Sequence, residues 1–486
     1  MSQEYILAID QGTTGTTAVL VDRGAQIRSV AYREITQIYP NPGWVEHDPH
    51  EIWESVRKVV SELTAAAGGR IRALGITNQR ETTVVWQRGS GEPVGNAIVW
   101  QCRRTADMCR GLKPYEDVFR TKTGLPVDPY FSGTKLRWIL DQEGVPDPGE
   151  LCFGTIDSWL IWKLTGGAQH VTDFTNASRT LLFNIKDKQW DAELCGLLGV
   201  PPDMLPQVRR SIDDFGAAEG LAGIDGVPIL GVAGDQQAAL FGQAGFASGS
   251  IKNTYGTGAF LLMNTGTDFV ASRKGLLTTL AVDGTGSPCF ALEGSVFIGG
   301  AALQWLRDEV GILAASSDSE SAARSVEDNA GVYMVPAFVG LGAPHWDMEV
   351  RGLITGLTRG ANRSHIIRAA LESMAYQTRD MLALMEKEAG VVVAQLATDG
   401  GAASNDFLLQ FQADILDRPV ARPAVIESTS LGAAFLAGLG CGFWQDAEEL
   451  SRTRVLERVF KPDMEPGMRA ELLAGWEKAL RQAMTA

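Results

Sequence analysis

Two short glycine-threonine turns, far apart in the sequence, could each grip a phosphate group. The first reads Asp10-Gln-Gly-Thr-Thr-Gly-Thr-Thr17 and the second reads Lys252-Asn-Thr-Tyr-Gly-Thr-Gly258. Glycine lets backbone N–H groups approach an anion closely, and threonine hydroxyls add further donors. Each turn alone is also ordinary hairpin chemistry, but the two together, each with an aspartate near it, favour a phosphate site between two similar halves.

The two aspartates beside these turns, Asp10 and Asp235, suggest a magnesium ligand and a base. Each closes an apolar run, residues 5–9 for the first and the run ending at Gly234 for the second. Hard cations favour oxygen ligands, and a carboxylate near an alcohol can accept its proton. Two plainer interpretations stay open, since Asp235 would also suit a helix N-cap and Asp10 an ordinary turn.

Regular elements that would position these residues alternate in both halves, which predicts a mixed α/β fold. The first half shows the hairpin, a strand near 27–35, a helix over 49–67, a strand over 71–76, and two helices within 130–164. The second half shows the other hairpin to 263, a segment over 294–309, a helix over 364–388, and a final helix near Leu431. The recurrence of strand, glycine turn and helix indicates a weak internal duplication.

Size and charge limit the classes of protein. A chain of 486 residues with 45% apolar and 21% charged residues predicts two domains, which we place at 1–245 and 246–486. The net charge of −15 argues against nucleic acid or an anionic membrane as a partner. The start carries no basic segment followed by an apolar one, and no apolar run approaches the ~20 residues of a membrane span, so we expect a cytoplasmic protein without stable membrane association.

Cysteine and histidine usage indicates neither a zinc site nor a disulfide framework. The six cysteines form no C-x-x-C pair, and among the five histidines His47 and His50 are closely spaced. We expect both histidines in a polar loop that leads into the helix over 49–67.

Common nucleotide-binding signatures are absent: the sequence has no G-x-x-x-x-G-K-[ST], no G-x-G-x-x-G after a strand and no protein-kinase set. Instead, eight motifs in order resemble the FGGY family of carbohydrate kinases, and within it the branch that phosphorylates glycerol. They are Gln11-Gly-Thr-Thr14, Gly75-Ile-Thr-Asn-Gln-Arg-Glu-Thr82, Asp128-Pro-Tyr-Phe-Ser-Gly-Thr-Lys135, Thr172-Asp-Phe-Thr-Asn-Ala-Ser-Arg179, Ala233-Gly-Asp-Gln-Gln-Ala-Ala-Leu-Phe-Gly-Gln243, Lys252-Asn-Thr-Tyr-Gly-Thr-Gly258, the stretch 336–347, and Thr398-Asp-Gly-Gly-Ala402. The resemblance spans nearly the whole chain.

The resemblance implies a fold, a reaction and partners. The fold would be α/β, with two ribonuclease H-like domains of the actin-like ATPase type, mixed sheets flanked by helices, and a cleft between the domains. The reaction would be ATP-dependent phosphorylation of glycerol to sn-glycerol 3-phosphate, the first step of glycerol catabolism, with magnesium as cofactor. The alternatives are a kinase for another small polyol or ketose and, in another class, a nucleotide-dependent scaffold. A homodimer or homotetramer is also implied.

The resemblance also assigns residues. Asp235 would be the general base and Asp10 would hold magnesium. The alcohol site would comprise Arg80, Glu81, Trp100, Tyr130, Asp235, Gln236, Phe260 and Thr13. The nucleotide would be bound by Thr13, Thr14, Gly15, Thr17, Thr257, Gly258, Gly300, Gln304, Gly401 and Asn405.

Neighbouring residues on a strand point to opposite faces, so Arg80 and Glu81 can share one ligand only where the strand ends or turns. We expect such a break within residues 78–82. Without the family resemblance, this Arg-Glu pair would be interpreted as a surface ion pair.

The sequence departs from the family pattern at two places. Thr17 stands where members usually carry arginine, so a cation near the nucleotide is missing. In addition, residues 220–228 contain no basic residue where some members bind a sugar bisphosphate inhibitor, which predicts that this inhibition is absent.

Overall fold

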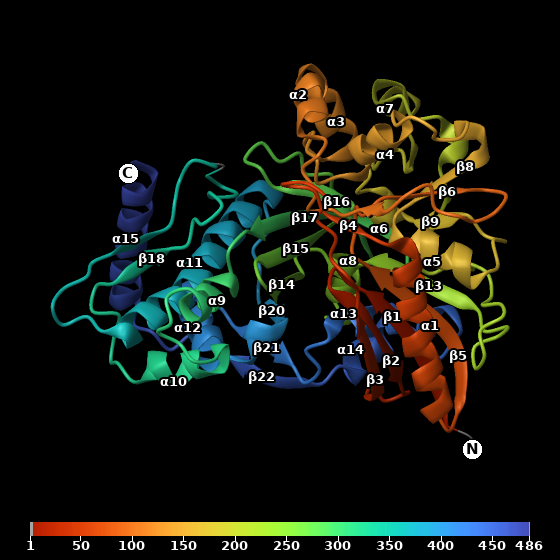
Figure 1. Cartoon of the computed structure of the whole chain (residues 1–486). Coiled ribbons are helices and arrows are strands. Elements are labelled where there is room, and N and C mark those ends of the chain that lie inside the picture. The colour runs from red at the N-terminus through yellow and green to blue at the C-terminus, as the bar shows by residue number, and fades with distance from the viewer. Residues whose placement is uncertain (1–2, 346, 486) are drawn as a thin grey trace.

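The computed structural model describes residues 3–345 and 347–485, and the chain forms two α/β halves (Figure 1). Trp346, part of one of the motifs, lies outside the described residues. Over the described ranges, no helix combines the length and apolar character needed to cross a membrane.

The first half is built on a sheet with the strand order β13-β5-β1-β2-β3. Strands β1 and β2 form the predicted antiparallel hairpin, and β5 and β13 continue the sheet in parallel with β1. Their bounds are β1 (Glu4–Gln11), β2 (Gly15–Val21), β3 (Ile27–Glu34), β5 (Arg70–Asn78) and β13 (Ile229–Gly234).

The second half is built on a sheet with the order β16-β17-β15-β14-β20-β21-β22. Strands β14 and β15 form the second predicted hairpin, and β20 lies parallel to β14. The bounds are β14 (Ile251–Tyr255), β15 (Ala259–Gly266), β16 (Leu277–Val282), β17 (Pro288–Val296), β20 (Leu396–Asp399), β21 (Val420–Pro423) and β22 (Leu456–Phe460).

The two sheets share one topology. The strand orders β3-β2-β1-β5-β13 and β17-β15-β14-β20-β21 correspond position by position. In each, the central hairpin (β1 with β2, β14 with β15) has two parallel strands beside its first strand and one antiparallel strand beside its second. The predicted internal duplication is therefore confirmed, and each glycine-threonine turn occupies the equivalent place in its half.

Shorter strands pair outside these sheets, and helices surround them. The paired strands are β4 (Glu46–His47) with β7 (Ala97–Ile98), β6 (Val84–Gln87) with β8 (Leu151–Gly154), β9 (Val171–Asp173) with β12 (Gln207–Arg209), β10 (Phe183–Asn184) with β11 (Gln189–Trp190), and β18 (Tyr333–Val335) with β19 (Leu353–Thr355). The helices of the first half are α1 (Pro49–Ala66), α2 (Ala106–Leu112), α3 (Glu116–Thr123), α4 (Ser132–Leu140), α5 (Ile156–Leu164), α6 (Phe174–Ala177), α7 (Ala192–Leu198) and α8 (Asp235–Gly242). Those of the second half are α9 (Ala301–Asp308), α10 (Ser319–Arg324), α11 (Arg363–Ala389), α12 (Asp406–Leu416), α13 (Ser428–Gly440), α14 (Ala447–Thr453) and α15 (Pro466–Thr485).

Helix α1 illustrates how local sequence sets an element. The Asp48 side chain accepts a hydrogen bond from the backbone N–H of His50, and Pro49 occupies the first helical position, where its missing N–H costs nothing. Its buried positions recur at Ile52, Val56 and Val59, one face of a helix that packs on β2 and β3.

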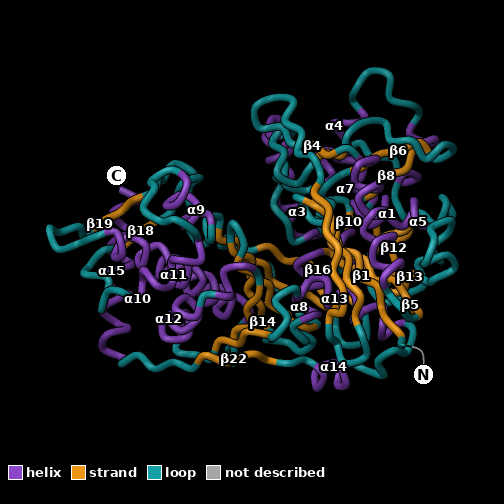
Figure 2. The backbone as a smooth tube through the Cα atoms, turned by 60° about the horizontal axis from the view of Figure 1, so that its bottom comes forward, coloured by secondary structure: helices purple, strands orange, loops and turns teal. Residues whose placement is uncertain are grey.

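Helices α8 and α13 form the layer between the two sheets (Figure 2). Helix α8 contacts β5 and β13 on one side and β14 and β15 on the other. Helix α13 belongs to the second half of the chain but packs on β1, β5 and β13 of the first, and in Figure 1 it lies in blue beside the red strand β1. The site residues at the start of α8 are thereby held between both halves.

Glycines make this layer possible. A Cβ at Gly432 on α13 would overlap the carbonyl oxygen of Ala238 on α8, and a Cβ at Gly75 on β5 would overlap the carbonyl oxygen of Ala433. Backbones approach at both places to distances that any larger residue prevents.

Two expectations are wrong. The helix near Leu431 is not the final one, because α14 and α15 follow it. Neither histidine lies in a polar loop. His50 lies in the first turn of α1, and His47 is fully buried in β4, within hydrogen-bonding distance of Gln37 and Gln79. Burial lowers the pKa of His47 to about 4, so the ring is a neutral structural group at physiological pH.

Candidate active site

The first glycine-threonine turn is held open by hydrogen bonds behind it. The carbonyl oxygen of Thr13 accepts from the Gln37 side chain at 2.8 Å, and that of Thr14 accepts from the backbone N–H of Ile35 at 3.1 Å. These bonds engage the loop carbonyls, whose oxygens would otherwise repel a phosphate. Thr17 lies farther along β2, half-buried and paired with Asp10.

Aromatic side chains stand next to this turn. The indole N–H of Trp100 donates to the hydroxyl oxygen of Thr13 at 2.9 Å, and the ring of Trp100 meets that of Tyr130 edge-on, with centroids 5.5 Å apart. The backbone N–H of Trp100 also donates to the Thr82 hydroxyl at 3.3 Å, so the tryptophan is tied to the segment after β5. The structure thus brings three predicted alcohol-site residues, Thr13, Trp100 and Tyr130, together.

Arg80 and Glu81 follow the end of β5, as the strand argument requires. Strand β5 ends at Asn78, and Glu81 has a left-handed backbone, with φ of 62°. A non-glycine residue in that region is strained, and such strain clusters at functional sites. Both side chains are 2% exposed, so the alternative of a surface ion pair is wrong.

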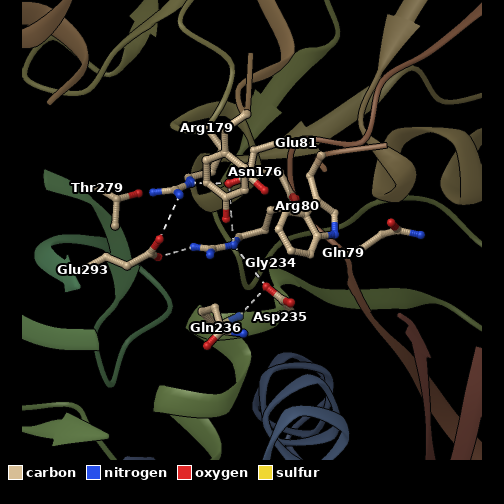
Figure 3. A network of polar contacts seen from close by, with 12 residues as sticks. Gln79, Arg80, Glu81, Asn176, Arg179, Gly234, Asp235, Gln236, Thr279 and Glu293 are labelled. Carbon is tan, nitrogen blue, oxygen red and sulfur yellow. Dashed lines mark hydrogen bonds and ion pairs between the residues drawn. The ribbon is translucent and has the colours of Figure 1, made fainter. Parts of the chain in front are cut away.

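A buried network of charges surrounds this pair (Figure 3). Arg179 contacts Glu81 at 2.5 Å and Glu293 at 2.9 Å, while Arg80 contacts Glu293 at 2.5 Å. The Nε of Arg80 lies 3.0 Å from Oδ1 of Asp235. Burial alone would raise the pKa of Glu293, but the charges of Arg179 and Arg80 outweigh it and lower this pKa to about 2.

Asp235 is the first residue of α8, and Gly234 rather than Asp235 is the N-cap. The interpretation of Asp235 as a helix cap is therefore wrong. Its side chain is 32% exposed, whereas the arginine that holds it is buried. The carboxylate can therefore meet a substrate while one of its oxygens is fixed.

The second glycine-threonine turn rests on the start of α9. Backbone N–H groups of Gly299 and Ala301 donate to the carbonyl oxygen of Thr257 at 2.8 and 3.0 Å, and Gly300 donates to that of Gly256 at 2.9 Å. The predicted nucleotide residues Thr257, Gly258 and Gly300 are thus neighbours. Phe260, a predicted alcohol-site residue, lies half-buried in β15 just after the turn.

The remaining predicted nucleotide residues lie around this turn or beyond it. Gln304 is exposed on α9, one turn after Gly300. Gly401 is exposed and follows β20, the neighbour of β14. Asn405 is the N-cap of α12, where its side-chain oxygen accepts from the N–H of Leu408 at 2.9 Å. That cap is a structural role the sequence interpretation did not foresee.

Asp10 lies at the end of β1 in a carboxylate-rich place. Burial, with the charges of Asp235 and Glu427 adding to it, raises the pKa of Asp10 to about 7. This excess of negative charge fits a divalent cation, which would compensate it. The described part of the chain holds no group of three or more His, Cys, Asp or Glu side chains that could bind a metal ion.

Comparison with known proteins decides the family. Models of the FGGY family of carbohydrate kinases match residues 5–242 with the N-terminal domain and residues 251–441 with the C-terminal domain. The chain is 57% identical to the glycerol kinase of Fusobacterium nucleatum over 491 residues, which cover 99% of each. The chain belongs to the FGGY family of carbohydrate kinases.

Solved structures agree with the FGGY assignment. The chain is similar to the glycerol kinase of Plasmodium falciparum with ADP, with a TM-score of 0.94 and 35% identity over 99% of this chain and 98% of that one. The gluconate kinase of Lactobacillus acidophilus shares the fold at a TM-score of 0.89, with 24% identity over 100% and 99% of the two chains. This FGGY kinase therefore has the two-domain, ribonuclease H-like fold of the actin-like ATPases, as its motifs implied.

Sequence reasoning missed several charged residues of the FGGY site. Arg179, Lys252 and Lys135 stand inside the family motifs but were assigned no role, and Glu293 lies outside all of these motifs. Lys135 is buried and donates to the carbonyl oxygens of Tyr130 and Phe131 as well as to that of Glu81, so it fixes the loops that carry two predicted residues. A signal was present for Glu293: a lone carboxylate directly after the apolar run 289–292 cannot be buried without partners.

Proposed function

We propose that this FGGY kinase transfers the γ-phosphoryl group of ATP to glycerol and forms sn-glycerol 3-phosphate. The observation that carries the proposal is Asp235, which stands at the start of α8 with one oxygen 3.0 Å from the buried Arg80. A fixed, partly exposed carboxylate beside a buried arginine and two aromatic rings is a site for a small alcohol. Curated glycerol kinases at 55–57% identity over the full length support the same substrate.

In the proposed reaction, Asp235 accepts the proton of the terminal hydroxyl as its oxygen attacks the γ-phosphorus. A new oxygen–phosphorus bond forms, the bond from the γ-phosphorus to the bridging oxygen breaks, and ADP leaves with that oxygen. Thr13, Thr14 and Gly15 from the first turn, and Thr257 and Gly258 from the second, would bind the phosphates. Magnesium near Asp10 would neutralise charge on them when bound.

The alcohol would lie between polar and aromatic groups. Arg80, Glu81 and Gln236 would pair with its hydroxyls, while Trp100 and Phe260 would cover its carbon edge. Sites that hydrogen-bond each hydroxyl reject analogues that lack one by as much as 10⁴–10⁵. Gly300, Gln304, Gly401 and Asn405 would contact the nucleoside part of ATP.

A second candidate is a kinase for another polyol or ketose, since the gluconate kinase of Lactobacillus acidophilus shares the fold. The test measures ADP release from ATP and magnesium with glycerol, dihydroxyacetone, erythritol, xylulose, gluconate or no acceptor. Turnover on glycerol, with little on the larger acceptors, is the expected result. Faster turnover on a larger acceptor would refute glycerol as the substrate. A rate of ADP release that is the same with and without an acceptor would favour a scaffold ATPase.

A further inference from the structure

Two charged residues stand in one row across the second sheet. Lys252 on β14 pairs with Leu262 on β15, and Leu262 pairs with Glu293 on β17. Directly paired residues of neighbouring strands project from the same face, and strands lie about 4.8 Å apart, so the two charged residues stand roughly 10 Å apart on one face. Leu262, which lies between them in this row, belongs to the same apolar cluster as Leu240 of α8, so this face is turned toward α8 and the first half.

Both charges are buried, and their partners come from the other half of the chain. Lys252 and Glu293 are 0% and 1% exposed. Glu293 contacts Arg80 at 2.5 Å and Arg179 at 2.9 Å, and the ammonium of Lys252 donates to the side-chain oxygen of Gln236. A buried charge is tolerated only with well-placed partners. These contacts therefore fix the positions of the partner side chains as well as those of Lys252 and Glu293.

We propose that Glu293 and Lys252 are positioning residues for the alcohol site. From the second sheet they set the orientation of Arg80 and Gln236, two residues of the first half. That these two residues bind the alcohol rests on the proposed function. The alcohol site is then complete only when the face of the second sheet meets α8.

The geometry explains how each contact orients its partner. The guanidinium group is a rigid planar fork, so Glu293 at one terminal nitrogen of Arg80 fixes the direction of Nε, which lies 3.0 Å from Asp235. Glu293 also supplies a counter-charge, without which Arg80 would be drawn further onto Asp235.

Lys252 orients Gln236 through donor and acceptor chemistry. An ammonium group can only donate, so it faces the amide oxygen of Gln236 and leaves the amide NH₂ to donate to an alcohol oxygen. The same ammonium donates to the carbonyl oxygen of Phe260 at 3.2 Å and to the hydroxyl of Thr254 at 2.7 Å. One buried cation therefore links a helix of the first half to the hairpin of the second phosphate turn.

The test compares Glu293→Gln and Lys252→Met with the wild type, and Glu372→Gln is the matched control. Glu372 is also buried and paired with an arginine, Arg368 at 2.7 Å, but on α11 away from the alcohol-site residues. Steady-state kinetics are measured for acceptor and ATP separately, with the acceptor that the wild type phosphorylates fastest. Tryptophan fluorescence reports binding of the same acceptor, and thermal unfolding reports the fold.

We expect kcat/KM for the acceptor to fall about 100-fold in Glu293→Gln and about 10-fold in Lys252→Met. KM for ATP should stay within about 3-fold in Glu293→Gln, because Glu293 contacts Arg80 and Arg179 and neither phosphate turn. In Lys252→Met, which also loses contacts to the hairpin of the second phosphate turn, KM for ATP should worsen less than kcat/KM for the acceptor. The control variant should keep kcat/KM for both substrates. If thermal unfolding of Glu293→Gln is not cooperative, the variant is not properly folded, and the kinetics of Lys252→Met alone test the inference.

The inference fails if both variants keep the wild-type kcat/KM for the acceptor, or if ATP and acceptor constants worsen equally. It fails also if Glu372→Gln loses as much acceptor efficiency as Glu293→Gln. Failure of the proposed function appears in the wild type instead, as preference for an acceptor other than glycerol. A wild type that neither turns over nor binds any acceptor refutes both.

Discussion

Replacing Asp235 with asparagine removes the proposed proton acceptor while keeping the shape of the side chain. Asparagine retains an oxygen that can accept from Nε of Arg80, now 3.0 Å from the carboxylate. Arg80 also keeps Glu293 at 2.5 Å and Glu81 at 3.8 Å, so it does not become an unpaired buried charge. We therefore expect the site to stay assembled and its chemistry to stop.

The size of the effect follows from these contacts. A positioned general base contributes about 10²–10⁴-fold to the rate, which corresponds to about 3–5 kcal/mol of activation free energy. The Asp235 side chain is 32% exposed. Loss of its charge should therefore cost less than about 1 kcal/mol of stability. A loss of about 1 kcal/mol lowers Tm by about 2–4 °C in domains of about 150–250 residues, so we expect the Tm of this longer chain to fall by no more than that.

The assay measures kcat at saturating ATP and acceptor, ATP affinity, and Tm by circular dichroism. Asp406→Asn is a matched control, because Asp406 is also the first residue of a helix, 29% exposed, and paired with Arg422 at 2.8 Å. The control should change Tm as little as Asp235→Asn does and leave kcat unchanged. A kcat for Asp235→Asn within about tenfold of the wild type would place the base elsewhere. An equal loss in both variants would attribute the effect to a weakened helix start.

Three further outcomes can be checked. Burial raises the pKa of Asp157 to about 7, and the Asp173 charge adds to this, so the folded chain binds a proton that the unfolded chain releases above its ordinary pKa of 3.8, and stability falls as pH rises through this window. Asp157→Asn is neutral at every pH, so its unfolding free energy in urea titrations should rise relative to that of the wild type as pH increases from about 4 to about 7. A difference that stays constant over this range would contradict the reasoning. Gly432→Ala should lose about 1–3 kcal/mol in a thermal melt, since its Cβ would overlap the Ala238 carbonyl oxygen, and an unchanged Tm would show that the helices separate freely. Fructose 1,6-bisphosphate at millimolar concentration should not inhibit, because residues 220–228 offer no cation, and a dose-dependent loss of activity would refute that reasoning.

Local sequence determined the elements. The helix expected over 49–67 is α1 (Pro49–Ala66), and that expected over 364–388 is α11 (Arg363–Ala389). Both glycine-threonine turns join hairpin strands, as their flanking runs predicted. The period of apolar residues, the caps and the glycines act between residues a few positions apart, so the sequence alone reveals them.

The break after β5 was likewise foreseen from strand geometry, because side chains of neighbouring strand residues alternate. The sequence did not predict which groups contact Arg80 at this break. The sequence motif placed Glu81 next to it, while Glu293 reaches it from 213 positions away.

Tertiary structure alone decided that α13 crosses to the first sheet and that Lys252 and Glu293 face α8. These arrangements depend on which faces of distant elements are buried against each other, and on partners that buried charges find only after the halves meet. A local pattern shows that a residue is charged or that a helix is apolar, but it does not show which distant element packs against that residue or helix. The candidate active site is assembled from such long-range contacts, and for that reason its supporting charges emerged only from the fold.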